Sequence, residues 1–482
     1  MNPYLVLGIV LGYFFVLMAI SWLTSRNADT QAFFTANRRS PWYLVAFGMV
    51  GATLSGVTFI SVPGEVGNSA FSYLQFVLGN IVGYWIVAGI LLPLYYRLNL
   101  VSIYSFLEQR FGVSSYKTGS FFFLISKLIG AAFRLFLVAG VLQIAFFDAF
   151  NIPFSLTVIV TIALIWVYTF KGGIKTIVWT DTLQTLFLVS AVIFTIIAIS
   201  RGLDLNFGAL VKEISTDSNS QIFFWDWRSG DNFFKQFIAG IFITIVMVGM
   251  DQDMMQKNLT CKNIKEAQKN MMVFSFSFLI TVVLFLSLGV MLYVFAKQNG
   301  IAVPESTDDL YPLLALHYFG LPVGIAFLLG ITAAAYSSAD SALTALTTSF
   351  SVDFLRIDRF NEKKKQRIKM GSHLMFSVLL IVVILIFEAI NDQSIVTAVF
   401  TVAGYTYGPI LGLFVFGMYS KRKVNDKWVP VVGLTAPVLC YFISSYSEEL
   451  FNGYKFGFEL LILNGLLTIG GLLLISKKNA EE

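Results

Sequence analysis

The sequence is poor in charge and in the side chains that build catalytic or metal centres. Of its 482 residues only 13% are charged, and it has two cysteines and two histidines. Soluble proteins carry about 25% charged residues, so this chain has too little polar surface for a body surrounded by water. Cys261 and Cys440 lie far apart and indicate neither a disulfide framework nor a metal site, and His317 and His373 are equally isolated. The net charge of +5 does not indicate a nucleic-acid partner, because the basic residues follow the connections between apolar segments.

The chain does contain a series of apolar runs, each long enough to cross a lipid bilayer. A spanning helix needs about 20 apolar residues, and hydrophobic residues make up 57% of the sequence. We therefore predict an all-α polytopic membrane protein with thirteen transmembrane helices in a single domain, 1–482. The predicted spans are 3–24, 42–63, 72–96, 118–144, 154–170, 175–199, 234–257, 271–296, 321–349, 370–389, 393–418, 428–446 and 457–476.

Basic residues alternate between rich and poor connections, which predicts the orientation of the spans. Lys and Arg near helix ends are retained on the cytoplasmic side. Every second connection is rich in them, as in the segments 257–269 and 356–369. The connections in between hold only Arg201, Lys212, Arg228, Lys235, Lys297 and Lys455. With thirteen spans, this pattern predicts an N-terminus outside the cell and a C-terminus in the cytoplasm.

Four ionisable side chains in the middle of predicted spans are candidate functional residues. Charged groups within a bilayer are costly and normally face a partner or a water-filled cavity. They are Lys127 and Arg134 in the fourth span, Asp181 in the sixth and Asp340 in the ninth. Lys127 and Arg134 are seven residues apart and therefore share one helix face. The planar guanidinium of Arg134 suits a carboxylate, whereas for Lys127 a structural ion pair with a neighbouring helix is an equal alternative.

Two spans carry many small and hydroxyl-bearing residues. In the second span, the segment 48–58 mixes glycines with threonines and serines. Such a segment breaks a helix at membrane depth only where protein or water takes up the freed backbone groups, and close helix packing is the alternative. The ninth span has a stripe of hydroxyls at helical spacing, formed by Ser337, Ser341, Thr344 and Thr348. These oxygens suit a hard cation such as sodium, unless they bond to their own helix backbone.

Several short motifs, in this order, resemble the sodium/solute symporter family, which includes sodium-coupled carriers of proline, sugars, iodide, monocarboxylates and sialic acid. They are Ser105-Phe-Leu-Glu-Gln-Arg-Phe-Gly112, Trp179-Thr-Asp181, Asp251-Gln252 with Gln256-Lys257, and Gly408-Pro-Ile-Leu-Gly-Leu-Phe-Val-Phe-Gly417. The resemblance covers nearly the whole chain and implies the leucine-transporter fold, with two inverted repeats of five helices. It predicts a leading helix at 3–24, repeat one at 42–199, repeat two at 234–418 and two trailing helices at 428–476. The broken first helices of the two repeats are expected to meet at mid-membrane and form the substrate cavity.

The resemblance implies that sodium is the coupling ion and that no organic cofactor is needed. The first sodium site would take oxygens from Gly51, Leu54, Ala334, Ser337 and Ser338. In members resembling sugar and sialic-acid carriers, a second site would be formed or served by Asp181, Ser337, Asp340 and Ser341. Asp340 stands where the family has a serine, about 100° round the helix from Ser341. This departure leaves the number of sodium ions open.

The resemblance also bears on the solute. The residues similar to the set that bacterial sialic-acid transporters use are Thr53, Ser55, Thr58, Phe71, Gln75 and Arg134, with the arginine gripping a carboxylate. Proline carriers have a carboxylate at the place of Thr53, and sugar carriers have an acid-amide pair at the places of Val57 and Thr58. Neither pattern is present. We therefore expect a carboxylated sugar such as sialic acid, with a monocarboxylate, a neutral sugar or an amino acid as the alternative.

The mechanism that the resemblance implies is symport by alternating access, in a bacterial inner membrane and by a monomer. Sodium would fix the opened second span against the ninth and complete the pocket, which requires different sodium affinities in the two states. A channel would need a continuous polar stripe on several helices, and a sensor would need a signalling domain, for which the residues after Ser476 leave little room. An enzyme would need acids, histidines or cysteines that face one another. We therefore predict a transporter that is not an enzyme and that has a small solute, sodium and the lipid bilayer as partners.

Overall fold

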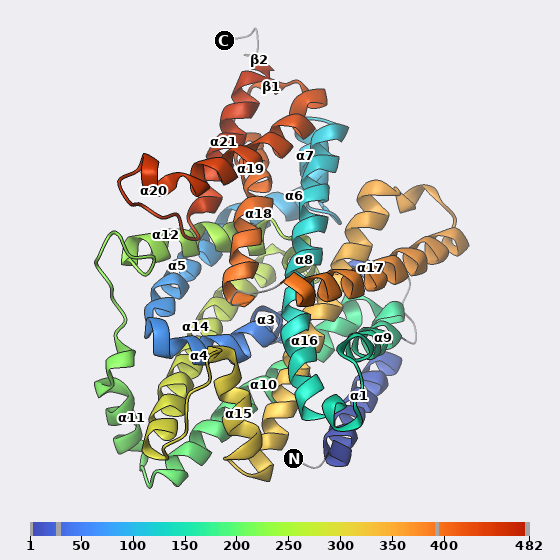
Figure 1. Cartoon of the computed structure of the whole chain (residues 1–482). Helices are drawn as coiled ribbons and strands as arrows, with labels where there is room; N and C mark the ends of the chain where they lie inside the picture. Colours follow the sequence, from blue (N-terminus) through green and yellow to red (C-terminus); the bar gives the residue numbers. More distant parts are fainter. Residues whose placement is uncertain (1–2, 26–29, 391–394, 478–482) are drawn as a thin grey trace.

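The computed structural model describes residues 3–25, 30–390 and 395–477, which fold almost entirely into helices (Figure 1). The first half of the chain forms α1 (Pro3–Ser25), α2 (Thr30–Thr35), η1 (Ala36–Arg38), α3 (Trp42–Thr53), α4 (Gly56–Ser69), α5 (Ser72–Ile86), η2 (Val87–Leu91), α6 (Leu92–Arg97), α7 (Ser105–Arg110), α8 (Val113–Ala145), η3 (Phe147–Phe150), α9 (Phe154–Gly172), α10 (Ile174–Gly202), α11 (Phe207–Thr216) and η4 (Ser218–Ser220).

The second half of the chain continues the helical pattern and adds one short strand pair. Its helices are α12 (Phe233–Thr244), η5 (Ile245–Gly249), α13 (Gln252–Asn258), α14 (Ile264–Gln298), η6 (Thr307–Asp309), α15 (Leu310–His317), α16 (Leu321–Ser349), η7 (Phe350–Phe354), η8 (Ile357–Arg359), α17 (Glu362–Ile390), α18 (Ile395–Tyr419), η9 (Asp426–Trp428), α19 (Val429–Ser445), α20 (Ser447–Leu450) and α21 (Leu460–Leu474). The strands β1 (Lys423–Val424) and β2 (Ser476–Lys477) pair antiparallel.

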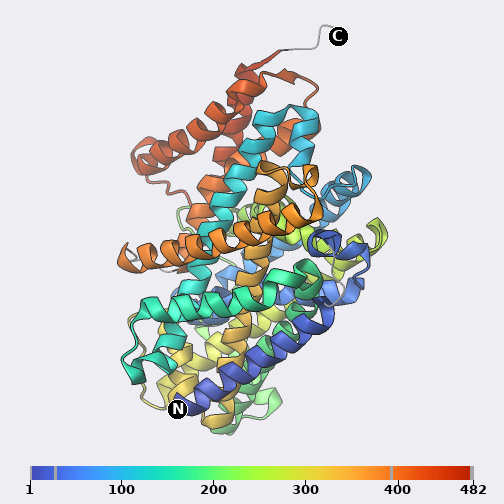
Figure 2. The same ribbon diagram turned by 90° about the vertical axis from the view of Figure 1, so that its right-hand side faces the viewer.

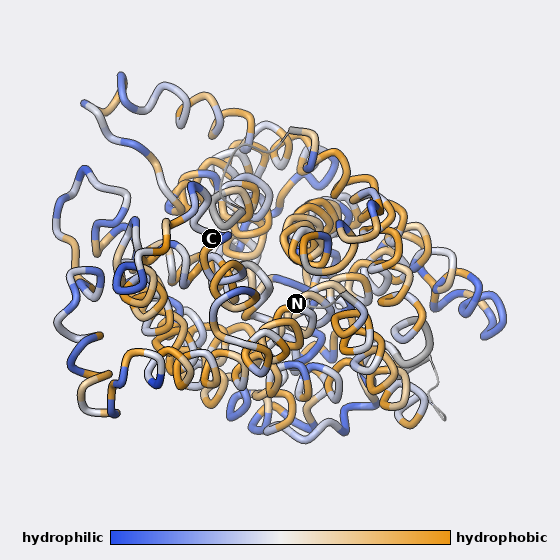
Figure 3. Tube along the Cα trace, turned by 60° about the horizontal axis from the view of Figure 1, so that its bottom comes forward, coloured by the Kyte–Doolittle hydropathy of each residue, from blue (hydrophilic) through white to orange (hydrophobic). Residues whose placement is uncertain are grey.

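The helices account for the predicted spans. Within the described ranges, nine helices are long and apolar enough to cross a membrane, or eleven if each of two bent helix pairs is one span. Two shorter apolar helices, Phe154–Thr169 and Leu460–Leu474, lie at the fifth and thirteenth predicted spans. Figure 3 shows apolar residues along the helices and hydrophilic residues in many of the connections. The polytopic all-α class is confirmed, whereas the count of thirteen spans stays a prediction, and residues 393–394 of the eleventh span lie outside the described residues.

Helix α16 lies at the centre of the molecule, beside α8 and α10 (Figure 1). Every residue from Gly330 to Ser349 is buried. Small and hydroxyl-bearing side chains allow this helix to be surrounded on all sides, because they let neighbouring backbones approach closely. The termini lie at opposite ends of the molecule in both views (Figure 1 and Figure 2).

The second predicted span is broken, as the sequence indicated. Helix α3 ends at Thr53, α4 begins at Gly56, and the two segments meet at an angle of 54°. The Ser55 N–H donates to the Thr53 carbonyl at 3.0 Å, so the Gly51 carbonyl loses the partner that a continuous helix would supply. On the other side of α3, the Gly51 N–H donates to Thr185 Oγ1 of α10 at 3.0 Å. A Cβ on Gly51 would lie 2.2 Å from that oxygen, so only glycine permits this contact.

The seventh predicted span is also broken. The segment Phe233–Gly249 meets α13 at 69°, and Asp251 caps α13 by accepting from the N–H groups of Asp253 and Met254. Two buried tyrosines satisfy the carbonyls freed at this break. Tyr95 donates to the Gly249 carbonyl at 2.7 Å, and Tyr104 donates to the Met250 carbonyl at 2.8 Å. The two spans that the resemblance predicts to be broken are thus both bent, while the two repeats and their boundaries stay a prediction.

Candidate functional site

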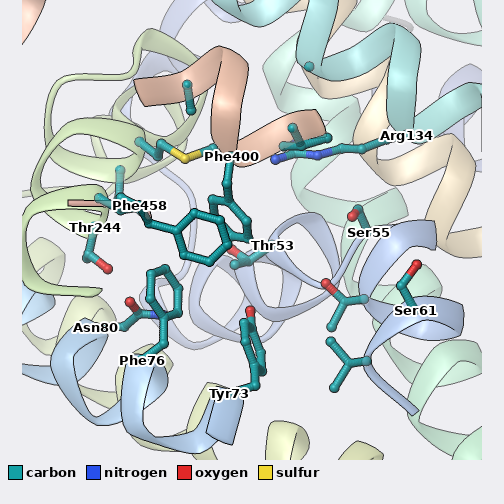
Figure 4. A pocket seen from close by; sticks show the side chains of 18 of the residues that line it. Thr53, Ser55, Ser61, Tyr73, Phe76, Asn80, Arg134, Thr244, Phe400 and Phe458 are labelled. Carbon is teal, nitrogen blue, oxygen red and sulfur yellow. The ribbon is translucent and has the colours of Figure 1, made fainter. Parts of the chain in front are cut away.

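A cavity of about 320 Å³ lies where the two broken spans face α5, α8 and α18 (Figure 4). This volume is at the lower end of the range of about 300–1,000 Å³ that is typical of small-molecule sites. Hydroxyl and amide groups in its lining come from Thr53, Ser55, Thr58, Asn80, Thr244 and Ser338. The cavity therefore joins polar groups of the broken second span to Ser338 of α16.

Arg134 brings an unpaired positive charge into this cavity. It extends from α8 among the lining side chains (Figure 4). No described acid lies within ion-pair distance of its guanidinium, and no described group is hydrogen-bonded to it. Lys127, the other cation of the lining, is already paired with acids. An anionic group entering the cavity would therefore find one planar, two-pronged donor without a competing partner.

Aromatic rings form another part of the wall. Phe76 of α5, Phe400 of α18 and Phe458, which precedes α21, gather together, with Tyr73 beside them (Figure 4). The ring centroids of Phe400 and Phe458 are 4.6 Å apart, and those of Tyr73 and Phe76 are 5.6 Å apart and nearly parallel. Large rigid apolar surfaces beside a few polar groups are typical of small-molecule sites.

The structure divides the predicted solute residues into two groups. Thr53, Ser55, Thr58 and Arg134 line the cavity, and Thr53 Oγ1 has no hydrogen-bond partner among the described residues. Phe71 and Gln75 do not belong to its lining.

Gln75 is fully buried and holds the connection before α12. Its Nε2 donates to the Asp231 carbonyl at 2.9 Å, and its Oε1 accepts from the Phe224 N–H at 3.1 Å. The Phe71 N–H likewise donates to the Gln221 carbonyl at 3.0 Å. The geometry thus gives Phe71 and Gln75 a structural role in place of the predicted contact with solute.

Phe76 and Asn80 are residues that the sequence reasoning missed. They have the same four-residue spacing as Phe71 and Gln75, and they line the cavity. Asn80 is buried, and in its preferred amide orientation it donates to the Gly240 carbonyl and to Thr244 Oγ1 of α12, both at 3.0 Å. The signal in the sequence was an aromatic residue followed four positions later by an amide. This pair occurs twice within 71–80, and only the fold decides which pair lines the cavity.

The residues of the predicted first sodium site converge from α3 and α16 on α10. Gly51 of α3 contacts Thr185 of α10. Ser337 Oγ of α16 donates to Asp181 Oδ1 at 2.6 Å, and Asp181 lies one helical turn before Thr185 on α10. Ser338 Oγ is buried, lines the cavity with Thr53 and Ser55, and has no hydrogen-bond partner among the described residues. Ala334 is fully buried on the same helix, and Leu54 is fully buried at the break. A freed carbonyl and an unpartnered hydroxyl are suitable ligands for a hard cation.

The residues of the predicted second sodium site are all buried but not all free. Tyr168 of α9 donates to Asp340 Oδ2 at 2.7 Å, while Asp340 Oδ1 and Ser341 Oγ have no hydrogen-bond partner of normal geometry in the described part of the chain. Asp181 is occupied on both sides, because Ser337 donates to one oxygen and the ammonium of Lys257 lies 2.8 Å from the other. Asp181 was predicted to offer its negative charge to a sodium ion, but in the structure that charge is paired with Lys257.

Lys257 is the largest difference between the sequence reasoning and the structure. Its position at the end of the seventh span assigned it to a cytoplasmic connection, yet its side chain is 2% exposed and paired with Asp181. It also lies 4.0 Å from Asp253, whose other oxygen is 2.7 Å from Lys127 of α8. Lys127 in turn lies 3.3 Å from Asp251, which accepts a short hydrogen bond from Tyr407.

These contacts form one buried charge cluster, which we define as Lys127, Asp181, Asp251, Asp253 and Lys257. It joins α8, α10 and α13, and three of its members, Lys127, Asp251 and Asp253, belong to the lining of the cavity. Buried charges are tolerated when each has a partner. For Lys127, the sequence left a functional role and a structural ion pair as equal alternatives. The structure shows ion pairs with Asp251 and Asp253.

Comparison with known proteins agrees with this architecture. The profile of the family described as "SSF: Sodium:solute symporter family" matches residues 33–427. The sodium/sialic acid symporter NanT of Aliivibrio fischeri is 27% identical over 473 residues, which cover 95% of this chain and 91% of that protein. SiaT of Proteus mirabilis, another sodium/sialic acid symporter, is 25% identical over 93% of this chain and 91% of its own. The human sodium/iodide cotransporter is 25% identical over 81% of this chain and 61% of its own.

Solved structures establish the fold. A sodium-coupled sialic acid symporter in a substrate-bound outward-open state superposes with a TM-score of 0.82 at 21% identity, covering 98% of this chain and 99% of that one. Mhp1, a nucleobase-cation-symport-1 family transporter, superposes with a TM-score of 0.57 at 16% identity over 93% and 95%. The predicted leucine-transporter type of fold is thereby confirmed. Since the family profile spans most of the chain, this protein belongs to the Sodium:solute symporter family and is a multi-pass membrane transporter, not an enzyme, that moves a small solute together with sodium.

Proposed function

We propose that this transporter imports a carboxylated sugar such as sialic acid by alternating access, driven by inward movement of sodium. The observation that carries the proposal is the half-buried, unpaired guanidinium of Arg134 in the lining of the cavity. A charge within a membrane span normally faces a partner or a water-filled cavity, so we expect the arriving solute to supply the anion. A carboxylate matches the geometry of the guanidinium with two parallel hydrogen bonds.

The rest of the cavity favours a sugar acid over a smaller anion. Thr53, Ser55 and Thr58 offer hydroxyls on one wall, and the aromatic rings of Phe76, Phe400 and Phe458 offer apolar surface on another. A sugar ring carries hydroxyls at its edge and C–H groups on its faces, so it suits both walls. Two relatives that match over more than 90% of both chains are sodium/sialic acid symporters, which supports the same class of solute.

Two sodium positions are part of the proposal. The first uses the carbonyls of Gly51, Leu54 and Ala334 with the hydroxyls of Ser337 and Ser338. Because Ser337 donates its hydrogen to Asp181, its lone pairs remain directed elsewhere and are available to a cation. The second uses the free oxygens of Asp340 and Ser341, with Asp181 acting through Ser337. Sodium at the first position would tie the broken second span to α16 and so complete the wall that bears Thr53 and Ser55.

We place the protein in a bacterial inner membrane as a monomer, with its N-terminus outside and its C-terminus in the cytoplasm. The alternation of basic connections supports this orientation, and an odd number of spans agrees with termini at opposite ends of the molecule. Glu65 and Asp231 line the cavity and lie next to connections that this orientation puts outside, and Lys127, Asp251 and Asp253 of the buried charge cluster line it as well. We propose that the ion pairs of this cluster close the cytoplasmic end of the cavity.

The solute is tested by uptake into proteoliposomes with an inward sodium gradient. We expect accumulation of labelled N-acetylneuraminate in sodium medium and none when potassium or choline replaces sodium. Pyruvate, glucose and proline, tested in parallel, represent the monocarboxylate, neutral sugar and amino acid alternatives. Preferred uptake of any of these three would replace the proposed solute, and accumulation independent of sodium would contradict the coupling.

The first sodium position is tested by Ser338→Ala. We expect the sodium concentration for half-maximal uptake to rise about tenfold or more, because a contact with a charged group contributes about 1.5–3 kcal/mol. Solute affinity at saturating sodium should change much less. Ser377→Ala is a matched control, since Ser377 is buried in α17 and bonds to the His373 carbonyl of its own helix. Equal effects of Ser338→Ala on sodium and solute would count against its role as a sodium ligand.

A further inference from the structure

Phe458 belongs to neither predicted repeat, yet its side chain lines the solute cavity. It lies in the segment between α20 and α21, and its ring centroid is 4.6 Å from that of Phe400 and 5.9 Å from that of Phe76 (Figure 4). Three separate parts of the chain therefore build one aromatic wall, which we define as Phe76, Phe400 and Phe458. The trailing part of the chain supplies one of its three rings.

Local contacts fix the position of Phe458. The next residue, Glu459, accepts a hydrogen bond from the Gly457 N–H at 2.9 Å and from the Tyr454 hydroxyl at 2.8 Å. The ring of Tyr454 is covered by the ammonium of Lys235 of α12, 4.1 Å from the ring centroid. The turn that carries Phe458 is thus stabilised by hydrogen bonds within the turn and by the contact of Tyr454 with Lys235 of α12.

Helix α21 is also locked to α18, which carries Phe400. Pro409 lies inside α18 and has no N–H to donate to the Tyr405 carbonyl four residues earlier. Asn464 of α21 supplies the missing donor, since its Nδ2 lies 2.8 Å from the Tyr405 carbonyl oxygen and 3.0 Å from that of Gly404. Gly408 makes room for this contact, because a Cβ there would lie 2.2 Å from the Asn464 side chain. Phe400 on α18 and Phe458, which directly precedes α21, therefore belong to parts of the chain that Asn464 holds together.

We propose that Phe458 is a specificity-determining residue of the solute site, and that its ring selects solutes with a sugar ring over small carboxylates. This inference rests on the proposed function. Arg134 binds the carboxylate that both kinds of solute share, so it does not separate them. A solute that extends beyond its carboxylate offers C–H groups to the aromatic wall, where the negative faces of the rings attract them. Asn464 acts as a positioning residue, because it holds the helix that follows Phe458.

The test compares Phe458→Ala with Phe456→Ala. Phe456 is a close control, because it lies two residues away in the same turn, packs on Phe451 and Tyr454, and does not belong to the lining of the cavity. We expect Phe458→Ala to raise the half-inhibitory concentration of N-acetylneuraminate at least tenfold in a competition assay and that of pyruvate less than twofold. Phe458→Tyr should restore the preference. A parallel loss for both competitors, or the same change in Phe456→Ala, would overturn the proposal.

A labelling experiment keeps this inference separate from the identity of the solute. The two native cysteines are buried, and burial raises the pKa of the Cys261 thiol to about 12, so background reaction with a maleimide should be low. We expect Phe458→Cys to be labelled and to be protected by whichever solute the wild-type protein imports, while Phe456→Cys is not protected. If N-acetylneuraminate is not imported but another solute protects Phe458→Cys, the proposed solute is wrong and the role of Phe458 in the site stands. Absence of protection by an imported solute would refute that role.

Discussion

Arg134→Lys is expected to weaken uptake of a carboxylated solute by about 1.5–3 kcal/mol, or about tenfold to a hundredfold in kcat/KM. Lysine keeps the positive charge but loses the planar fork that binds both oxygens of a carboxylate. Arg134→Ala removes the charge as well, so its loss should be larger. Both variants should retain the fold, because no described residue depends on Arg134 for an ion pair or a hydrogen bond.

The measurement is the initial rate of sodium-driven uptake in proteoliposomes over a range of solute concentrations. Arg228→Ala is the control for a lost positive charge, since Arg228 is exposed on the connection before α12. The sodium concentration for half-maximal uptake should remain near the wild-type value in Arg134→Lys. Wild-type uptake by Arg134→Lys, or a loss that is equally large for a neutral solute, would remove Arg134 from the carboxylate site.

Lys257→Met is expected to destabilise the protein by about 3–5 kcal/mol, because removing one partner leaves buried charges uncompensated. Lys257 is the cation that lies against Asp181 and Asp253, and its side chain is almost fully buried. Lys257→Arg keeps the charge and should retain most of the stability. In the double variant Lys257→Met/Asp181→Asn, the charge removed from α13 is matched by one removed from α10, so part of the lost stability should return.

The measurement is the apparent midpoint of thermal unfolding in detergent, with sodium at a fixed concentration. The exposed pair of Lys455 and Glu448 provides the comparison, because exposed ion pairs contribute only about 0–1 kcal/mol. Lys455→Met should therefore leave the midpoint almost unchanged. If Lys257→Met unfolds at the wild-type temperature, or if the double variant is no more stable than the single one, the buried charge cluster does not hold these helices together.

Local sequence was sufficient to predict the helices, whereas the meeting of the broken second span with Ser338 was predicted from the family resemblance. Glycines and hydroxyls in 48–58 are compatible with a break or with close helix packing, and local sequence alone did not decide between the two. The face of α5 that points inward was not predictable in this way. Ala70 has a φ of 51°, α5 begins only at Ser72, and a shift of five residues turns the helix by about 140°. As a result Phe76 lines the cavity, and Phe71 does not.

The ion-pair partners of the buried lysines could not be predicted from the sequence either. Lys127 pairs with residues more than 120 positions away, and Lys257 pairs with Asp181 on another helix. A rule that assigns every lysine near a helix end to the cytoplasm misplaces Lys257, although it still predicts termini on opposite sides. The number of basic residues in each connection predicts the orientation of the spans. It does not predict the position of a single lysine side chain, which depends on the acids that pack near it.

The tyrosine contacts at the second break have a consequence for the relation between the two halves of the molecule. At the break of the seventh span, Tyr95 and Tyr104 donate to the carbonyls of Gly249 and Met250. At the break of the second span, the freed carbonyl of Gly51 belongs to the sodium site that we propose. In the repeats that we propose, phenol groups at one break therefore take the place that a sodium ion would take at the other.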